Sequence, residues 1–182
     1  MNPQDQEQQI HKNNMRKNAA ERLIQESRHV ELMMCNLVFM RELIDLNKTD
    51  DQILLNGREV DLSSEQLIGL YELIKNDFLD ILPDISERIL NHMECAARSE
   101  QSDLTDARDW IYNVICKLSF VQMLAEIPAS ETCVSLSYQA AIGLSGILRN
   151  IEGDLEAIHE TLYSTGNDMA SDLSSDAGSA KH

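Results

Sequence analysis

The chain has 182 residues, with 15 Lys or Arg against 31 Asp or Glu, which gives a formal net charge of -16 at pH 7. This balance argues against direct nucleic-acid binding and against attraction to anionic lipid, because both require clustered Lys and Arg. Hydrophobic residues make up 43% of the chain, aromatic residues only 4%, and there are 7 Gly and 3 Pro. Such a composition favours one domain of long helices that pack through aliphatic side chains and Met.

The beginning of the chain, MNPQDQEQQIHKNN, is polar throughout and does not resemble a signal peptide. The densest apolar stretch, Leu32–Met40, is too short to span a bilayer. The cysteines show no CxxC spacing and fall mostly within apolar helical patterns; they are Cys35, Cys95, Cys116 and Cys133. We therefore predict a cytoplasmic protein that does not interact with membranes, with reduced, buried thiols and neither a disulfide framework nor a zinc knuckle.

Residues 1–14 are rich in Gln and Asn and lack periodicity, which predicts a disordered N-terminal tail. A single helical domain is expected over residues 15–163. Its first helix is predicted from Met15 to Leu46, where apolar residues recur at every seventh position. The early part of this helix is the only basic region of the chain, and we interpret it as a solvated helix face.

The segment after the first helix contains Asn56–Gly57 between two short apolar runs. Asn and Gly tolerate the positive φ that a type I′ turn requires, so the pattern predicts a short β-hairpin or a tight turn near residues 53–60. A two-stranded hairpin is not stable alone, and this one is therefore expected to rest on the helices.

A second helix is predicted to start at Ser63 or Ser64, which suit the N-cap position, and to reach Ala97. Pro83 interrupts its apolar pattern. Because proline lacks a backbone donor and clashes with the preceding turn, we expect a kink or a break there. The first half of the domain thus spans residues 15–98.

The second half is expected over residues 103–163. It contains a helix from about Asp103 to Glu126 and a further helix that ends before Gly166. Residues 164–182 are rich in Ser, Asp, Gly and Ala, a composition that predicts a disordered acidic C-terminal tail.

Two segments of the chain are near copies. Leu62–Asn76 reads LSSEQLIGLYELIKN, and Leu136–Asn150 reads LSYQAAIGLSGILRN. Each follows a helix with a CxLxF pattern, at Cys35–Phe39 and at Cys116–Phe120. We interpret the pairing as an internal duplication. The sequence therefore predicts an all-α fold, a pseudo-symmetric four-helix bundle built from two duplicated helical hairpins.

Glycines occur inside the predicted helices of both copies, at Gly69, Gly143 and Gly146. Ala would be the better helix former at each position. We therefore expect these glycines to mark places where helices approach closely.

Two Glu-x-x-His spacings, Glu26–His29 and Glu156–His159, raise a metal-site alternative. Ferritin-like di-metal bundles use two such elements together with single Glu residues from two other helices. Here the two pairs flank the apolar stripes and occupy non-equivalent positions in the two halves, the wrong pattern for a duplicated site. We interpret both as surface ion pairs and predict no catalytic, cofactor-binding or metal-ligating residue. A di-metal carboxylate enzyme remains the alternative.

Acidic side chains recur at helical spacing in the second predicted helix, at Asp77, Asp80, Asp84 and Glu87. They predict a negative face suited to a basic protein partner. The Asn56–Gly57–Arg58 turn, present only in the first half, is the second candidate partner-binding segment. The predicted function is non-catalytic protein–protein interaction of the inhibitor, immunity, antitoxin or adaptor type. A structural or assembly subunit is a further alternative.

The first predicted helix is apolar over more than one face between Leu32 and Met40. One stripe is enough for an intramolecular core, so the excess requires another cover. This predicts a homodimer formed through the first helix.

Overall fold

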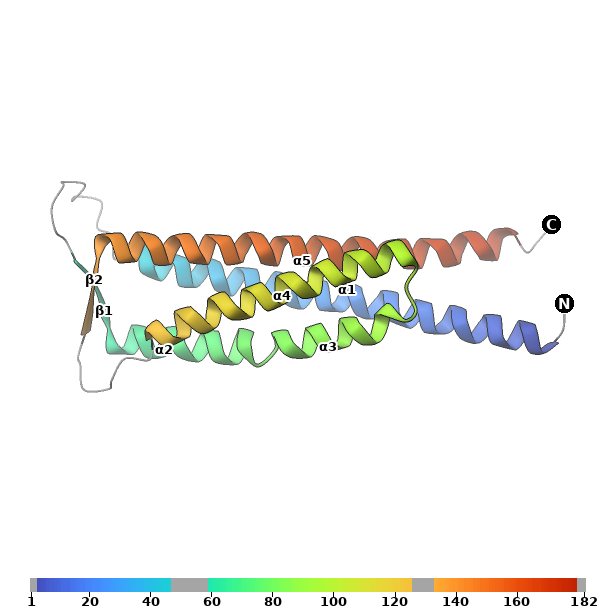
Figure 1. The fold of residues 1–182 in the computed structure, drawn as a ribbon, viewed down its shortest axis with the longest axis horizontal. Coiled ribbons are helices and arrows are strands. Elements are labelled where there is room, and N and C mark those ends of the chain that lie inside the picture. The colour runs from blue at the N-terminus through green and yellow to red at the C-terminus, as the bar shows by residue number, and fades with distance from the viewer. Residues whose placement is uncertain (1–2, 47–58, 126–132, 180–182) are drawn as a thin grey trace.

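The computed structural model describes residues 3–46, 59–125 and 133–179. The protein is an almost entirely helical bundle of four antiparallel rods, the second of which is broken (Figure 1). The rods are formed in chain order by α1 (Pro3–Leu46), by α2 (Ser64–Ile74) with α3 (Leu82–Met93), by α4 (Arg98–Ala125), and by α5 (Tyr138–Ser179). Among the described residues, no helix is long and apolar enough to cross a membrane.

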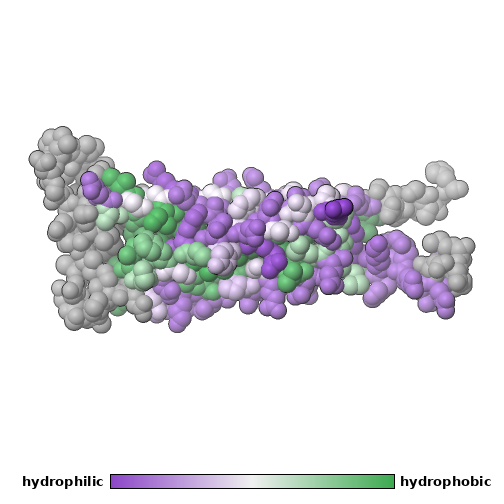
Figure 2. All heavy atoms as spheres, viewed as in Figure 1, coloured by the Kyte–Doolittle hydropathy of each residue, from purple (hydrophilic) through white to green (hydrophobic). Residues whose placement is uncertain are grey.

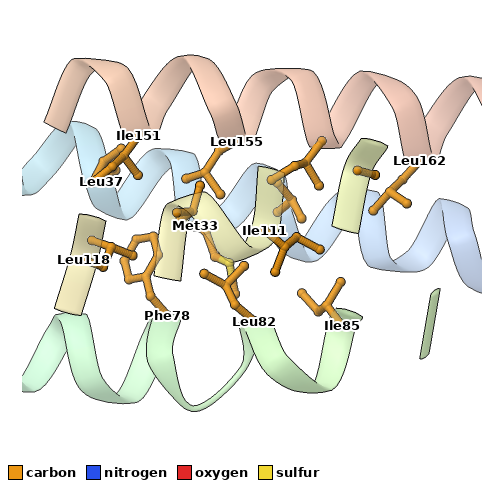
Figure 3. Packing of buried hydrophobic residues seen from close by; sticks show 14 of the residues in the cluster. Met33, Leu37, Phe78, Leu82, Ile85, Ile111, Leu118, Ile151, Leu155 and Leu162 are labelled. Carbon is orange, nitrogen blue, oxygen red and sulfur yellow. The ribbon is translucent and has the colours of Figure 1, made fainter. Parts of the chain in front are cut away.

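The core lies along the bundle axis and is made of aliphatic residues, Met and one Phe (Figure 3). All four rods contribute residues to it. In α1 the buried residues follow the predicted seven-residue spacing. Side chains that meet there include Met33, Leu37, Phe78, Leu82, Ile111, Leu118, Ile151 and Leu155. The scarcity of aromatic residues is therefore compatible with a continuous core.

Helices α1 and α5 are longer than predicted. Helix α1 begins at Pro3, not near Met15, and α5 continues to Ser179 instead of ending before Gly166. The prediction of disordered tails is wrong for the described parts, residues 3–14 and 164–179. The two helices lie against each other and extend together past the α3–α4 connection (Figure 1). In the added part of α5, where Thr165, Gly166 and Met169 are buried, tertiary contact that the sequence does not reveal supports helix formation. In the added part of α1, nearly all described residues from 4 to 14 are exposed.

Small residues allow this part of the α1–α5 contact. Ala19 and Ala20 of α1 and Met169 of α5 are buried there. Gly166 lies within α5, where a Cβ atom would come 2.8 Å from Ile24 Cγ1 and 3.0 Å from the Ala20 carbonyl oxygen. The glycine that we predicted to follow a helix end is therefore a point of close helix approach.

The glycines that we predicted to mark close packing do not. An added Cβ at Gly69, Gly143 or Gly146 would meet no described atom within 4 Å. All three are exposed. Periodicity reveals a glycine inside a helix, but it does not reveal whether another helix lies beside it.

A two-stranded antiparallel sheet joins the two halves at the end of the bundle opposite the termini (Figure 1). Strand β1 (Glu59–Ser63) pairs with β2 (Cys133–Ser137), and Asp61 lies opposite Ser135. Of the predicted hairpin at residues 53–60, residues 53–58 lie outside the described part of the chain. Glu59 and Val60 pair across the two halves with β2.

The second rod is broken near Pro83. Helix α2 is followed by a π-helical turn over Lys75–Leu79, which buries Phe78, and α3 restarts at Leu82. Pro83 occupies the first turn of α3, where its missing N–H needs no intrahelical partner. The alternatives left open by the sequence are thus decided in favour of a break.

Helix α4 begins at Arg98, earlier than the predicted Asp103. Glu100 accepts a hydrogen bond from the backbone N–H of Ala97, which precedes the helix. This contact satisfies one of the unpaired donors at the helix start, as in a capping box. The residues between the two predicted halves therefore belong to the first turns of α4.

Candidate interaction surface

Most of the basic side chains between the rods are engaged in ion pairs. The Arg41 guanidinium of α1 pairs with Glu152 of α5. Lys117 Nζ of α4 lies 2.5 Å from Asp154 Oδ2 of α5. These contacts link different helices, so the cations hold the bundle together and contribute less to its outer surface.

Arg16 connects three segments at the other end of the bundle. Its Nη2 lies 2.6 Å from Glu100 Oε1 of α4 and 2.9 Å from Asp172 Oδ2 of α5. Glu100 is buried and also receives the Ala97 N–H. This cluster fastens α1 and α5 to the start of α4.

A buried carboxylate joins α1 to α3. Glu26 is only 4% exposed, and its Oε1 lies 2.8 Å from Arg88 Nε. Arg88 Nη2 donates to Oε2 at 3.1 Å, and His29 Nδ1 lies 3.1 Å from the same oxygen. The interpretation of Glu26 as part of a surface ion pair is therefore wrong, because Arg88, distant in sequence, covers it.

The two Glu-x-x-His spacings differ in their contacts. His159 Nδ1 lies 2.9 Å from the backbone oxygen of Ser27, its ring stacks on Tyr163, and Glu156 is exposed. Glu26 instead contacts Arg88. Within the described ranges, no three His, Cys, Asp or Glu side chains gather in a way that could hold a metal ion. The geometry of these residues therefore gives no support to the di-metal alternative.

His92 lies beside this buried ion pair, in the last turn of α3. Burial lowers the pKa of His92 below 6.5, and the nearby Arg22 and Arg88 charges lower it further, whereas Glu26 acts in the opposite direction. A cationic imidazole is therefore disfavoured in the folded protein.

Three of the predicted partner-binding acids are exposed. Asp84 and Glu87 lie on α3, and Asp80 lies between the π-helical turn and α3. Asp77 differs, since it is partly buried and its Oδ2 accepts a hydrogen bond from Asn36 Nδ2 at 3.0 Å. The other candidates, Asn56, Gly57 and Arg58, lie outside the described residues.

Helix α4 adds acidic residues that were not among the predicted partner-binding residues. Asp103, Asp106 and Asp109 are all exposed, and α4 packs beside α3. Their three-residue spacing on one helix was the available signal. We call the six exposed side chains together the acidic face; its members are Asp80, Asp84, Glu87, Asp103, Asp106 and Asp109.

The basic residues nearest to the acidic face are directed into the bundle. Arg88 pairs with Glu26, and Arg108 Nε donates to Ser86 Oγ at 3.3 Å. Arg98, at the start of α4, and Lys75, in the π-helical turn before α3, are exposed. The α3–α4 surface therefore presents mainly carboxylates, and hydrophilic side chains dominate this part of the molecule in Figure 2.

Apolar side chains are exposed nearer the sheet end of the bundle, where green patches gather in Figure 2. Phe39 of α1 and Phe120 of α4 are 54% and 45% exposed, and Ile68 of α2 and Ile142 of α5 are 60% and 47% exposed. Each half of the protein thus presents one Phe and one Ile from the similar sequence segments.

The apolar excess of α1 is smaller than the sequence suggests. Met33, Leu37 and Met40 are buried in the core, whereas Leu32 and Phe39 are exposed. The homodimer through this helix stays a prediction. The expectation of buried thiols is wrong for Cys35 and Cys116, which are exposed, because both lie on the outer sides of their helices.

Comparison of the chain with protein-family models, with curated proteins and with solved structures found no match.

Proposed function

We propose that this protein is a non-catalytic, cytoplasmic interaction protein that binds a basic protein partner through the acidic face. The observation that carries the proposal is the local excess of carboxylates on the acidic face. Its six carboxylates are exposed on α3, on α4 and at Asp80 before α3, whereas Arg88 and Arg108 contact other helices, and Lys75 and Arg98 are exposed nearby. Complementary charge accelerates association and selects partners by sign.

Salt should weaken this interaction, because exposed charges separated by more than about 8 Å are largely screened at physiological ionic strength. The net charge of -16 acts in the same direction as the acidic face and repels other acidic proteins. The proposal therefore covers inhibitors, immunity proteins, antitoxins and adaptors whose targets are basic.

We further propose that the two halves arose by duplication, so that one half could keep the bundle while the other specialised. The buried positions of α1 and α4 support this, because they correspond at one constant spacing. The corresponding pairs are Leu23 with Leu104, Val30 with Ile111, Met33 with Val114, Leu37 with Leu118, and Met40 with Val121.

The second and fourth rods give similar support. Before the π-helical turn, Leu70 and Ile74 correspond to Leu144 and Leu148, the spacing of the sequence repeat. After it, the buried positions correspond only if the spacing is shortened by one residue; the pairs are Phe78 with Ile151, Leu82 with Leu155, Ile85 with Ile158, and Ile89 with Leu162. A π-helical turn holds one more residue than an α-helical turn and absorbs this difference.

The β1–β2 register has the same symmetry. Asp61 and Ser135 occupy equivalent positions in the two sequence copies, and they lie opposite each other. An antiparallel pair of equivalent strands with equivalent residues at its centre has a local two-fold axis. Two copies of one ancestral hairpin would pair in this way.

Affinity purification from the native host, followed by mass spectrometry, tests the proposed function. We expect one basic protein in stoichiometric amount, and its recovery should fall when Asp80, Asp84 and Glu87 are all replaced by Lys. The control variant replaces Glu156 and Glu160 of α5 by Lys; both residues are also exposed. Recovery of this protein alone, or a partner equally sensitive to both variants, would contradict the acidic-face proposal.

A further inference from the structure

A groove lies between the end of α1 and the start of α2. It has a volume of about 750 Å³ and is lined by Phe39, Met40, Glu65, Gln66, Gly69, Leu70 and Leu73. The lining residues of α2 recur at the spacing of one helix face, so the groove runs along that helix. In the second half, by contrast, α4 and α5 pack along each other.

Gly69 forms part of the wall of this groove. It is exposed within α2, and an added Cβ would meet no described atom within 4 Å. Glycine weakens an exposed helix relative to Ala, and nothing inside the described molecule compensates for that effect. A partner group that approaches the backbone of α2 closely would explain why glycine occupies this position.

The walls of the groove are apolar and its charges are negative. Phe39 is 54% exposed, and Leu70 and Leu73 continue the apolar surface on α2. Glu65 lines the groove, and Glu72 is exposed on the same helix, which contains no Lys or Arg; exposed Lys75 follows the end of α2. The nearest cation of α1, Arg41, is already paired with Glu152.

We propose that this groove binds an amphipathic helix of the partner protein, with an apolar face flanked by Lys or Arg. Helix-in-groove recognition uses anchors at the same spacing that α2 presents. The groove volume lies within the usual range for pockets that hold several anchoring side chains. A second copy of this chain fits less well, because each copy carries a net charge of -16. This inference rests on the proposed function and names where the apolar part of the partner is held.

The test uses a fluorescently labelled amphipathic peptide of Leu and Lys in helical spacing, and the full-length protein. Gly69→Leu fills the groove with a good helix former. Gly146→Leu is the matched control, since Gly146 is also exposed in a helix with open space around it. We expect Gly69→Leu to raise the peptide Kd by about tenfold, which corresponds to one buried anchor, and Gly146→Leu to leave it unchanged. Unchanged helicity of both variants by circular dichroism shows that the bundle is intact.

The outcomes separate the groove from the acidic face. Equal binding by both glycine variants, with loss of binding in the Asp80, Asp84 and Glu87→Lys variant, would overturn the groove but keep the proposed function. Failure of the peptide to bind the wild-type protein would overturn the groove, whereas the proposed function is decided separately by the affinity purification. A dimer in light scattering that Gly69→Leu dissociates would assign the groove to a second copy and overturn a heterologous partner.

Discussion

Replacement of Gly166 by Ala probes the contact with α1 that supports the continuation of α5 beyond its predicted end. A Cβ atom at this position would lie 2.8 Å from Ile24 Cγ1, 3.0 Å from the Ala20 carbonyl oxygen and 3.4 Å from the Ile24 backbone nitrogen. The Ile24 side chain can rotate away. The other two atoms belong to the backbone of α1, so relief requires the two helices to separate.

Two effects of opposite sign determine the size of the change. Ala is favoured over Gly in a helix interior by about 1 kcal/mol. Overpacking of a close contact costs about 1–3 kcal/mol, and backbone atoms place this site in the upper part of that range. We expect a net destabilisation of about 1–2 kcal/mol. For a protein of this size, each kcal/mol lowers Tm by about 2–4 °C.

Urea and thermal unfolding followed by far-UV circular dichroism would measure this change. Gly146→Ala is the control, because it makes the same chemical change in the same helix where nothing lies within 4 Å. That variant should gain about 0.5–1 kcal/mol. The two substitutions should therefore shift stability in opposite directions.

Equal stabilisation by both substitutions would refute close packing of α1 against α5 at Gly166. A double-mutant cycle with Ile24→Ala adds a second criterion. Removing Ile24 Cγ1 should reduce the cost of Gly166→Ala, while Gly146→Ala and Ile24→Ala should be additive.

Further predictions concern the buried Glu26 contact. Arg88→Met should destabilise the protein by about 3 kcal/mol, measured by urea unfolding, because it removes the guanidinium from a buried carboxylate and leaves Glu26 with the contact to His29. A change below about 0.5 kcal/mol would contradict burial of the pair. The pKa of His92 is lower in the folded protein than in the unfolded chain. On acidification the unfolded chain therefore binds a proton first. Stability that is present above pH 6.5 is lost as the pH falls through the pKa of the folded state. Replacement by Gln should remove that loss, and the stability difference between wild type and His92→Gln should thus decrease on acidification from pH 7 to pH 5. A difference that is constant with pH would contradict the lowered pKa.

The sequence predicts those features of the fold that depend on local periodicity. The seven-residue spacing of Leu23, Val30 and Leu37 identifies core positions of α1, and all three are buried. Pro83 correctly marks the interruption of the second rod, since its effect on a helix is local. The all-helical bundle follows from such patterns.

Features that depend on distant residues escape the same reasoning. From its sequence position Glu26 is predicted to be exposed, because Arg88, which pairs with it, belongs to another helix. Gly166 reads as a helix terminator, and only the presence of Ala20 opposite makes it a contact. The β1–β2 pairing likewise joins strands from different halves. In each case, the environment of a residue is determined by a contact with a residue that is distant in the sequence.

The two halves also differ in ways that bear on the proposed duplication and specialisation. At the position of buried Glu26, the second half has buried Ala107, a side chain that requires no partner. The first half contains the π-helical turn and the groove beside Gly69, whereas α5 is one continuous helix over the corresponding residues. A buried carboxylate and an irregular turn both lower stability relative to the simpler alternative. Among the described residues, these features lie in the half that also carries the groove and the α3 part of the acidic face, so the first half is where a partner-specific surface is expected.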